Sequence, residues 1–210
     1  MSLSSFLGPF LLVASTHSLD YLKELSNLSQ TFRALNEKAS HFIDIGLIDS
    51  SGKHRAYVGP YDLKDADYLG TYWFEQTMLK GLYISNVLMG FRKTPHFFIA
   101  VRHSQGNVST ILRATIDSNS LASLLSMTKS GQTGEVFLLD SYGIFQTSPR
   151  CVGSIMGESG IPVSLFSGES GILIYDTNNP SNSLSIESSI PLLFRLRITL
   201  SPPSSDQILA

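Results

Sequence analysis

The sequence predicts an α+β fold in which a long N-terminal helix precedes two consecutive modules, each an antiparallel sheet with flanking helices. Three observations support this prediction. Apolar residues recur every three or four positions over 19–39, which is the period of an amphipathic helix. Two strand-like runs flank a turn at 49–52, which is typical of a hairpin. A similar strand and turn occur again at 134–143.

The first module is expected to contain one five-stranded antiparallel sheet. After the helix over 19–39, the turn Asp-Ser-Ser-Gly at 49–52 joins the first two strands, and Gly59 and Pro60 end the second. A second helix is expected within 61–80, over 68–80, because this stretch carries a run of aromatic residues before the next strand begins. The five strands are expected, in order, at 42–49, 54–58, 82–89, 96–103 and 109–117.

The second module repeats this order in part. A short helix is expected at 121–127, a hairpin formed by 134–140 and 144–147, and further strands at 171–176, 183–188 and 192–200. The sequences of 45–52 and 135–143 both contain an apolar strand followed by Asp-Ser and a glycine turn. Two similar modules in tandem are therefore expected. The predicted boundaries are 1–40 for the N-terminal helix, 41–118 for the first module and 119–210 for the second.

Composition excludes several classes of protein. The 210 residues carry a formal net charge of −2, so they lack the basic surface that nucleic-acid binding requires. Cys151 is the only cysteine, which excludes an internal disulfide and a zinc site of four thiolates. The longest apolar run, 6–14, is interrupted by Gly8 and Pro9 and is shorter than the ~20 residues of a membrane-spanning helix.

The enzyme-like motifs do not support catalysis. Five residues separate Gly46 from Gly52, one more than a phosphate-binding loop allows, and His54 stands where that loop needs Ser or Thr. Ser126 and Lys129 have a serine-to-lysine spacing known from penicillin-recognising enzymes, but the Ser-Asp-Asn motif is absent. The five histidines include no pair at the helical spacing of metal ligands. We therefore expect no catalytic residue, no metal and no cofactor.

Three consecutive aromatic residues indicate a ligand site. Tyr72, Trp73 and Phe74 spread over almost a full helical turn, so they cannot all enter one core. At least one of them should face solvent or a cavity, and an indole N–H can orient a small ligand while its ring covers apolar parts. Ordinary packing of the helix on the sheet is the alternative for Trp73. A pocket that contains both Trp73 and Tyr83 is the stronger hypothesis.

Strand alternation adds polar candidates to this pocket, because every second residue of a strand shares a face. Asp117 ends the fifth strand, where a free carboxylate could bind a ligand ammonium; capping the helix that begins near 118 is the alternative. Arg113 lies on the same strand face as Asp117. The strand residues expected at the site are Tyr83, Ser85, His96, Phe98, Arg113 and Asp117.

Several segments resemble the double Cache sensor domains of bacterial transmembrane histidine kinases. The similarity covers roughly residues 10–200 and is carried by AYVGPYDL at 56–63, YWF at 72–74, YIS at 83–85, PHFFIAV at 95–101, LRATID at 112–117 and GQTGEVFL at 131–138. The resemblance implies a membrane-distal and a membrane-proximal PAS-like module outside the cytoplasmic membrane. In the parent receptor this sensor lies between two spanning helices, neither of which is present in the chain.

The resemblance also implies a ligand site with one important departure. In amino-acid-sensing members, an arginine two residues before the tryptophan clamps the ligand carboxylate, and an aspartate at the position of Asp117 holds the amine. Here Thr71 occupies the arginine position, and a hydroxyl cannot form the bidentate contact. Arg92, Arg102 or Arg113 could replace it from elsewhere, or the ligand is a different small molecule.

These observations predict the extracytoplasmic, periplasmic sensor domain of a membrane-anchored bacterial receptor, most simply a two-component histidine kinase. The expected partner is a small carboxylate, amine or amino-acid-like molecule in the distal module, with signal transmission through the proximal one. Two alternatives remain. The chain could be a ligand-free structural module that dimerises through its N-terminal helix, or the sensor of a chemoreceptor or a diguanylate cyclase.

Overall fold

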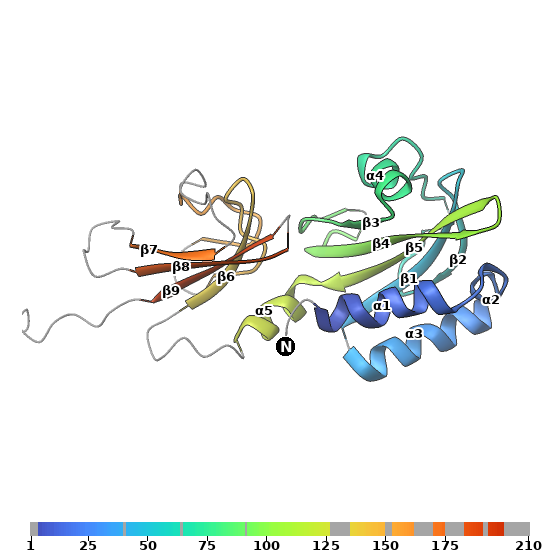
Figure 1. The fold of residues 1–210 in the computed structure, drawn as a ribbon, viewed down its shortest axis with the longest axis horizontal. Coiled ribbons are helices and arrows are strands. Elements are labelled where there is room, and N and C mark those ends of the chain that lie inside the picture. Colours follow the sequence, from blue (N-terminus) through green and yellow to red (C-terminus); the bar gives the residue numbers. More distant parts are fainter. Residues whose placement is uncertain are drawn as a thin grey trace, which may run out of the picture. The chain divides into compact units, whose positions relative to one another are not determined.

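The protein forms two compact units, residues 1–120 and 121–210, each with its own antiparallel sheet (Figure 1). The computed structural model describes residues 4–39, 41–63, 65–90, 92–126, 135–149, 153–161, 170–174, 183–190 and 193–199. Helices flank the sheet of the first unit. The predicted α+β class is therefore confirmed.

The N-terminal region contains three helices rather than one long helix: α1 (Ser4–Thr16), α2 (Leu19–Lys23) and α3 (Leu25–Ala39). The predicted helix over 19–39 is interrupted at Glu24, whose backbone is extended at φ −75° and ψ 121°. Sequence analysis did not predict α1. This helix forms despite Pro9 because it buries Phe10 and Ala14, and packing commonly overrides intrinsic propensity.

The first unit is built on a five-stranded sheet in the order β2-β1-β5-β4-β3, with all neighbours antiparallel. Helices α1 to α3 cover one face of this sheet, and α4 (Tyr72–Lys80) covers the other (Figure 1). β3 is shorter than predicted, although Ser85 and Leu88 continue to bond to β4. The strands are β1 (Phe42–Asp49), β2 (His54–Val58), β3 (Leu82–Ile84), β4 (His96–Gln105) and β5 (Val108–Asp117).

Because helices cover both faces, the central strands are buried on both sides. In β1, the cross-strand register places Asp44, Gly46 and Ile48 opposite Thr115, Arg113 and Ile111 of β5. Of these, Ile48 and Ile111 belong to the apolar cluster that contains Phe74 of α4. The face beneath α4 therefore combines apolar residues with a carboxylate, a guanidinium and a hydroxyl.

The turn between β1 and β2 connects the sheet to the loop that precedes α4. Asp49 Oδ1 accepts hydrogen bonds from the backbone N–H groups of Ser51 and Lys53, at 2.8 and 3.2 Å. Gly52 has φ +79°, and a Cβ there would lie 2.4 Å from the backbone nitrogen of Leu69. The carbonyl of Gly52 accepts a hydrogen bond from Tyr68 N–H at 3.0 Å. Glycine at this position thus allows the close approach that positions Tyr68.

The second unit contains a four-stranded antiparallel sheet in the order β6-β9-β8-β7, and helix α5 (Ser118–Ser126) begins directly after β5. Residues 144–147 do not form the predicted strand, since Ile144 and Phe145 make only isolated bridges. Asp140 Oδ1 accepts from the N–H groups of Tyr142 and Ile144, as Asp49 does in the first unit. The strands are β6 (Glu135–Asp140), β7 (Ser170–Ile174), β8 (Ser183–Ile190) and β9 (Leu193–Thr199).

Candidate functional site

A buried guanidinium lies inside a cage of aromatic rings between α4 and the sheet. The carbon Cζ of Arg113 is 4.4 Å from the ring centroid of Phe98, 5.1 Å from that of Tyr68 and 5.2 Å from that of Trp73. Arg113 is only 6% exposed. We call Tyr68, Trp73 and Phe98 the aromatic cage. Cation–π contacts with the cage stabilise the charge, most strongly because water is excluded.

The start of α4 explains how its three aromatic residues are distributed. The side chain of Tyr72 is 67% exposed, Phe74 is buried in the apolar cluster, and Trp73 packs edge-on against Tyr68 and Phe98 at centroid distances of 5.1 and 5.0 Å. Thr71, which precedes the helix, donates its hydroxyl hydrogen bond to the carbonyl of Tyr68 at 2.7 Å. As predicted from their spacing, the three rings do not enter one core.

Arg113 and Thr115 present unsatisfied polar atoms on the same strand face. Arg113 Nε and Thr115 Oγ1 are buried without a hydrogen-bond partner, and the two residues are two positions apart on β5. Among the described residues, no carboxylate forms an ion pair with Arg113. Buried polar atoms in native proteins nearly always have a partner, so two neighbouring exceptions point to a missing ligand or water.

The surroundings of Arg113 act on its charge in both directions, since burial lowers its pKa while the nearby Tyr68 and Asp44 raise it. The nearby positive charge of Arg92 also lowers the pKa of Arg113. Arginine nevertheless remains protonated in proteins. The small residues Gly46 and Ala100 lie directly opposite Arg113 on the two neighbouring strands. Within the described part of the chain, this buried cation is thus held on the sheet without a carboxylate bonded to it.

A second arginine in this region does have an acidic partner. Arg92 donates from Nε and Nη2 to Asp44 Oδ2 at 2.9 and 2.5 Å, and both side chains are 3% exposed. The hydroxyl of Tyr57 also donates to Asp44, at 3.3 Å. The guanidinium of Arg92 stacks on Tyr61, with 5.2 Å between Cζ and the ring centroid. We call this the Asp44–Arg92 pair; it joins β1 to the segment that precedes β4.

His96 is bonded to the Asp44–Arg92 pair in a way that identifies its tautomer. Its Nδ1 lies 2.7 Å from the carbonyl of Thr94 and therefore donates to it, while Nε2 lies 3.2 Å from Arg92 Nη1 and accepts from it. This arrangement requires a neutral imidazole. Burial, together with the charges of Arg92 and Arg113, lowers the pKa of His96.

His54, at the start of β2, is also neutral at physiological pH. Its Nε2 is 3.3 Å from the hydroxyl of Tyr68, and its Nδ1 is buried without a partner. Burial and the charge of Arg113 lower the pKa of His54 to about 4. Its ring packs so closely on Gly46 that a Cβ at that position would lie 2.5 Å from it.

We expect His54 to make the protein sensitive to acid. The unfolded chain binds a proton at His54 near pH 6.5 and the folded protein only near pH 4, so stability falls as the pH drops below about 6.5. Between pH 7 and 5 the loss attributable to this half-buried ring should be about 1 kcal/mol after allowance for solvent screening. Urea unfolding of His54→Gln at both pH values should show a smaller loss than the wild type. An equal loss in both proteins would contradict this account, and His17→Gln, directly after the end of α1, is the control.

The other predicted site residues have structural partners. Ser85 Oγ accepts a hydrogen bond from Phe98 N–H at 2.9 Å. Tyr83 is half-buried between Phe98 and Tyr72, with centroid distances of 6.1 and 6.2 Å. Asp117 Oδ1 accepts from Asn119 N–H at 2.9 Å at the start of α5, which is the capping alternative considered for it. Trp73, Phe98 and Arg113 are brought together, and His96 lies in the neighbouring polar cluster.

Sequence analysis did not identify the roles of several polar residues in this region. Asp44 could have been noticed, because it is an acidic residue within the otherwise apolar run of 42–48. Thr115 shares the strand face of Arg113, which was the available signal for it. Arg92 lies in a loop and pairs with a residue 48 positions away, so no local pattern indicates its role. Arg102, another candidate, is exposed and donates from Nη1 to the carbonyl of Met78 near the end of α4.

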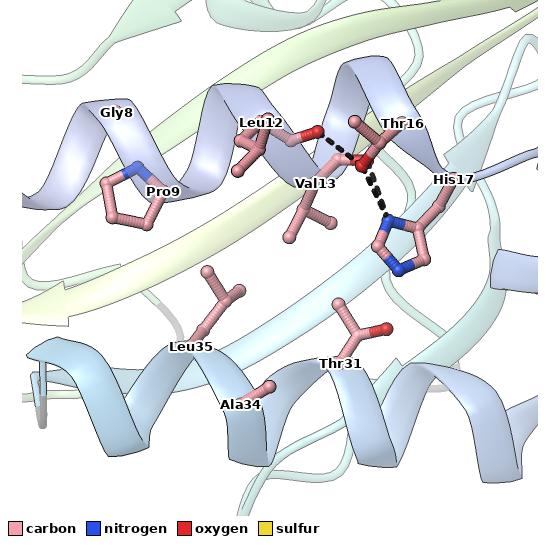
Figure 2. A pocket seen from close by; sticks show the side chains of 9 residues that line it. All are labelled: Gly8, Pro9, Leu12, Val13, Thr16, His17, Thr31, Ala34 and Leu35. Atoms are coloured by element: carbon pink, nitrogen blue, oxygen red, sulfur yellow. Dashed lines mark hydrogen bonds between the residues drawn. The ribbon is translucent and has the colours of Figure 1, made fainter.

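Three of the cavities lined by described residues lie around the first unit. One, of about 310 Å³, is an apolar groove in which Val13 of α1 points toward Thr31 and Leu35 of α3 (Figure 2). A second, of about 440 Å³, lies beside the turn between β1 and β2. The third, of about 330 Å³, is lined in part by His54, Tyr57 and Tyr61. His54 contacts Tyr68 of the aromatic cage, while Tyr57 and Tyr61 contact the Asp44–Arg92 pair.

The described residues contain neither a helix that could span a membrane nor a group of side chains that could bind a metal ion. None of the helices in that part of the chain is long and apolar enough to cross a membrane. Within the same residues, no group of three or more histidine, cysteine, aspartate or glutamate side chains could hold a metal ion.

Comparison with solved structures identifies the fold. The chain is similar to an extracellular ligand-binding receptor from Desulfohalobium retbaense DSM5692 (TM-score 0.70, 12% identity), covering 94% of this chain but only 36% of the receptor chain. The ligand-binding domain of the Pseudomonas aeruginosa PAO1 amino acid chemoreceptor PctC, solved with GABA, has a TM-score of 0.64 and 13% identity over 93% of this chain and 88% of that domain.

A domain described as the extracellular part of a histidine kinase has a TM-score of 0.67 and 16% identity, over 98% of this chain and 89% of that one. Comparisons with protein-family models and with curated proteins found no match. At these identities the similarity establishes the fold, which is that of extracellular ligand-binding and sensor domains.

Proposed function

We propose that the chain is an extracytoplasmic sensor domain that binds a small molecule between α4 and the sheet of the first unit, without catalysing a reaction. The observation that carries this proposal is the pair of unsatisfied buried atoms, Arg113 Nε and Thr115 Oγ1, beneath the aromatic cage. Leaving such groups without a hydrogen bond costs free energy that a bound acceptor would recover. Solved domains of the same fold contain GABA, L-Gln and L-Arg.

The surroundings of these atoms suit a small organic ligand. The cage rings can cover apolar parts of the molecule, while Arg113 and Thr115 determine its orientation. The cavity of about 330 Å³ beside β2 lies next to the aromatic cage through His54 and next to the Asp44–Arg92 pair through Tyr57. This position supports entry of the ligand from that side. Trp73 and Tyr68 pack directly on Arg113, so a ligand that reaches the guanidinium has to displace part of the cage.

A further part of the proposal concerns the parent protein. We infer a membrane-anchored bacterial receptor with a double Cache arrangement, in which the second unit is a PAS-like module that transmits the signal. The similar turns at Asp49 and Asp140 support two related modules. A histidine kinase is the preferred parent, and a chemoreceptor or a GGDEF-type enzyme is supported by domains of the same fold. Ligand-dependent differences of ~1 to 3 kcal/mol between two states suffice for signalling.

A ligand-free dimerisation module is the second candidate. The apolar groove between α1 and α3 supports it, together with Leu12, which is 57% exposed at the edge of that groove (Figure 2). This candidate predicts a homodimer that Leu12→Asp disrupts and whose melting temperature no small molecule raises.

A thermal-shift screen of small carboxylates, amines, amino acids and sugars tests the sensor proposal. A ligand at about 100 times its dissociation constant adds about 2.7 kcal/mol to the free energy of unfolding, and at least one compound should produce such a shift. We expect Trp73→Ala to abolish the shift, because the ring covers the ligand. Leu79→Ala, on the exposed side of the same helix, is the matched control and should preserve it. The absence of any shift, or an equal shift in Trp73→Ala, would refute the proposed site.

A further inference from the structure

We infer that the site beneath α4 selects a carboxylate that carries no ammonium group and discriminates against α-amino acids. This inference rests on the proposed ligand site and specifies the chemical class of its ligand. It follows from the charges that the protein buries around the site and from the partners that its carboxylates already have.

The buried charges on this sheet face do not balance. Asp44 and Arg92 neutralise one another, and Arg113 contributes a further positive charge that is bonded to no acid among the described residues. His96 is neutral, since it donates to Thr94 and accepts from Arg92. His54 is neutral as well, and protonation would place another cation beside Arg113. One positive charge therefore remains for a ligand to neutralise, and a monoanionic group does so.

Within the described residues, the carboxylates on or near this face either accept hydrogen bonds from the protein or are exposed to solvent. Asp44 accepts hydrogen bonds from both Arg92 and Tyr57. Asp117 Oδ1 accepts a hydrogen bond from the N–H of Asn119 at the start of α5. The acidic residues of the loop before α4 are exposed to solvent: Asp62, Asp65 and Asp67. An ammonium group in the buried site would meet Arg113 without an opposing charge.

The groups that do face the site are hydrogen-bond donors. Arg113 Nε can only donate a hydrogen bond. Thr115 lies two residues further along β5, and its hydroxyl can donate to the same anionic group. A carboxylate has two acceptor oxygens and would satisfy both atoms, with charge-assisted hydrogen bonds from the guanidinium. The aromatic cage then covers the carbon chain behind the carboxylate. Arg113, Thr115 and the aromatic cage offer no negative charge to a ligand ammonium group.

Matched pairs of compounds that differ by one amine test the inference. Isothermal titration of the whole domain would compare propionate with L-alanine, butyrate with GABA, and succinate with L-aspartate. We expect at least one amine-free compound to bind, and its amine-bearing partner to bind about 100-fold more weakly or not at all, because the amine meets an unopposed guanidinium.

Variants then show whether binding uses the groups named here. Thr115→Val keeps the shape of the side chain and removes the hydroxyl, so it should weaken binding of the amine-free compound by about tenfold. Arg33→Gln, on α3 at the opposite face of the sheet, should leave the affinity unchanged. Circular dichroism of each variant verifies folding, and Thr115→Ser should restore the affinity to within about threefold of the wild type.

The outcomes separate this inference from the proposed function. Binding of an amino acid as tightly as its amine-free partner would overturn the inference, while the sensor proposal would stand if Trp73→Ala abolished that binding. An unchanged affinity in Thr115→Val would also overturn it. Failure of all six compounds, together with a positive hit among sugars or amines in the wider screen, would refute the carboxylate class alone. Failure of both screens would refute the ligand site itself.

Discussion

Replacing Arg92 with methionine is expected to lower the free energy of unfolding by about 3–5 kcal/mol. The substitution leaves the carboxylate of Asp44 buried, with only the hydroxyl of Tyr57 as a hydrogen-bond donor in place of three. It also removes the stacking of the guanidinium on Tyr61 and the donor to His96. An unpaired buried charge is among the few changes that destabilise a protein this strongly. Urea unfolding at pH 7 measures the effect.

Arg55 provides a matched control for this measurement. It also pairs with an aspartate, Asp49, but its side chain is 64% exposed, so Arg55→Met should cost less than about 1 kcal/mol. The double variant Arg92→Met/Asp44→Asn should recover part of the loss, because it removes the stranded charge. If the free energy of unfolding of Arg92→Met were within about 1 kcal/mol of the wild-type value, the Asp44–Arg92 pair would not stabilise the fold as we describe.

Replacing Arg113 with methionine is expected to abolish ligand binding while changing the stability of the free protein much less than Arg92→Met does. Loss of charge-assisted hydrogen bonds worth about 1.5–3 kcal/mol each should weaken binding of the tightest carboxylate by about 100-fold or more. No protein carboxylate is stranded by this substitution. The substitution removes cation–π contacts that stabilise the folded protein by up to about 2 kcal/mol each. It also removes the free-energy cost of burying the guanidinium charge, which offsets this loss.

Titration calorimetry and urea unfolding of the same preparation separate these two effects. Arg33→Met, on the opposite face of the sheet, should preserve both affinity and stability. Arg113→Lys should bind more weakly than the wild type, since an ammonium group lacks the planar donors of the guanidinium. A variant that lost several kcal/mol of stability and retained full affinity would show that Arg113 is a structural residue. The contrast between a large loss of stability in Arg92→Met and a loss of binding with little change of stability in Arg113→Met is the sharpest test of the site.

Most of the fold could be predicted because the first unit marks its elements locally. The hairpin of β1 and β2 was predicted with its correct bounds, since turn chemistry separates two short apolar runs. The break at Glu24 could not be seen, because the apolar spacing continues from Leu22 through Leu25 to Leu28 without a change of period. Helix α1 escaped prediction because Gly8 and Pro9 lower its propensity and only tertiary contacts of Phe10 stabilise it.

The site could be predicted only in part, for a similar reason. The arrangement of Trp73 and Phe74 follows from helical geometry and is visible in the sequence. Which arginine remains without an acidic partner depends on pairs formed across the sheet, and Arg92 reaches Asp44 over 48 residues. Strand alternation placed Arg113 and Asp117 on one face of the fifth strand, but the helix cap at Asp117 was one of two equal alternatives until the backbone position of Asn119 was known.

The buried guanidinium of Arg113 has a practical consequence for handling the protein. A buried guanidinium that binds a carboxylate does not distinguish a physiological metabolite from acetate, formate or citrate supplied by a purification or crystallisation buffer. Such salts, present at millimolar concentration, would raise the melting temperature by mass action and hide a weaker natural ligand. Preparations in an amine buffer, dialysed against low chloride, are therefore the proper starting material for any screen.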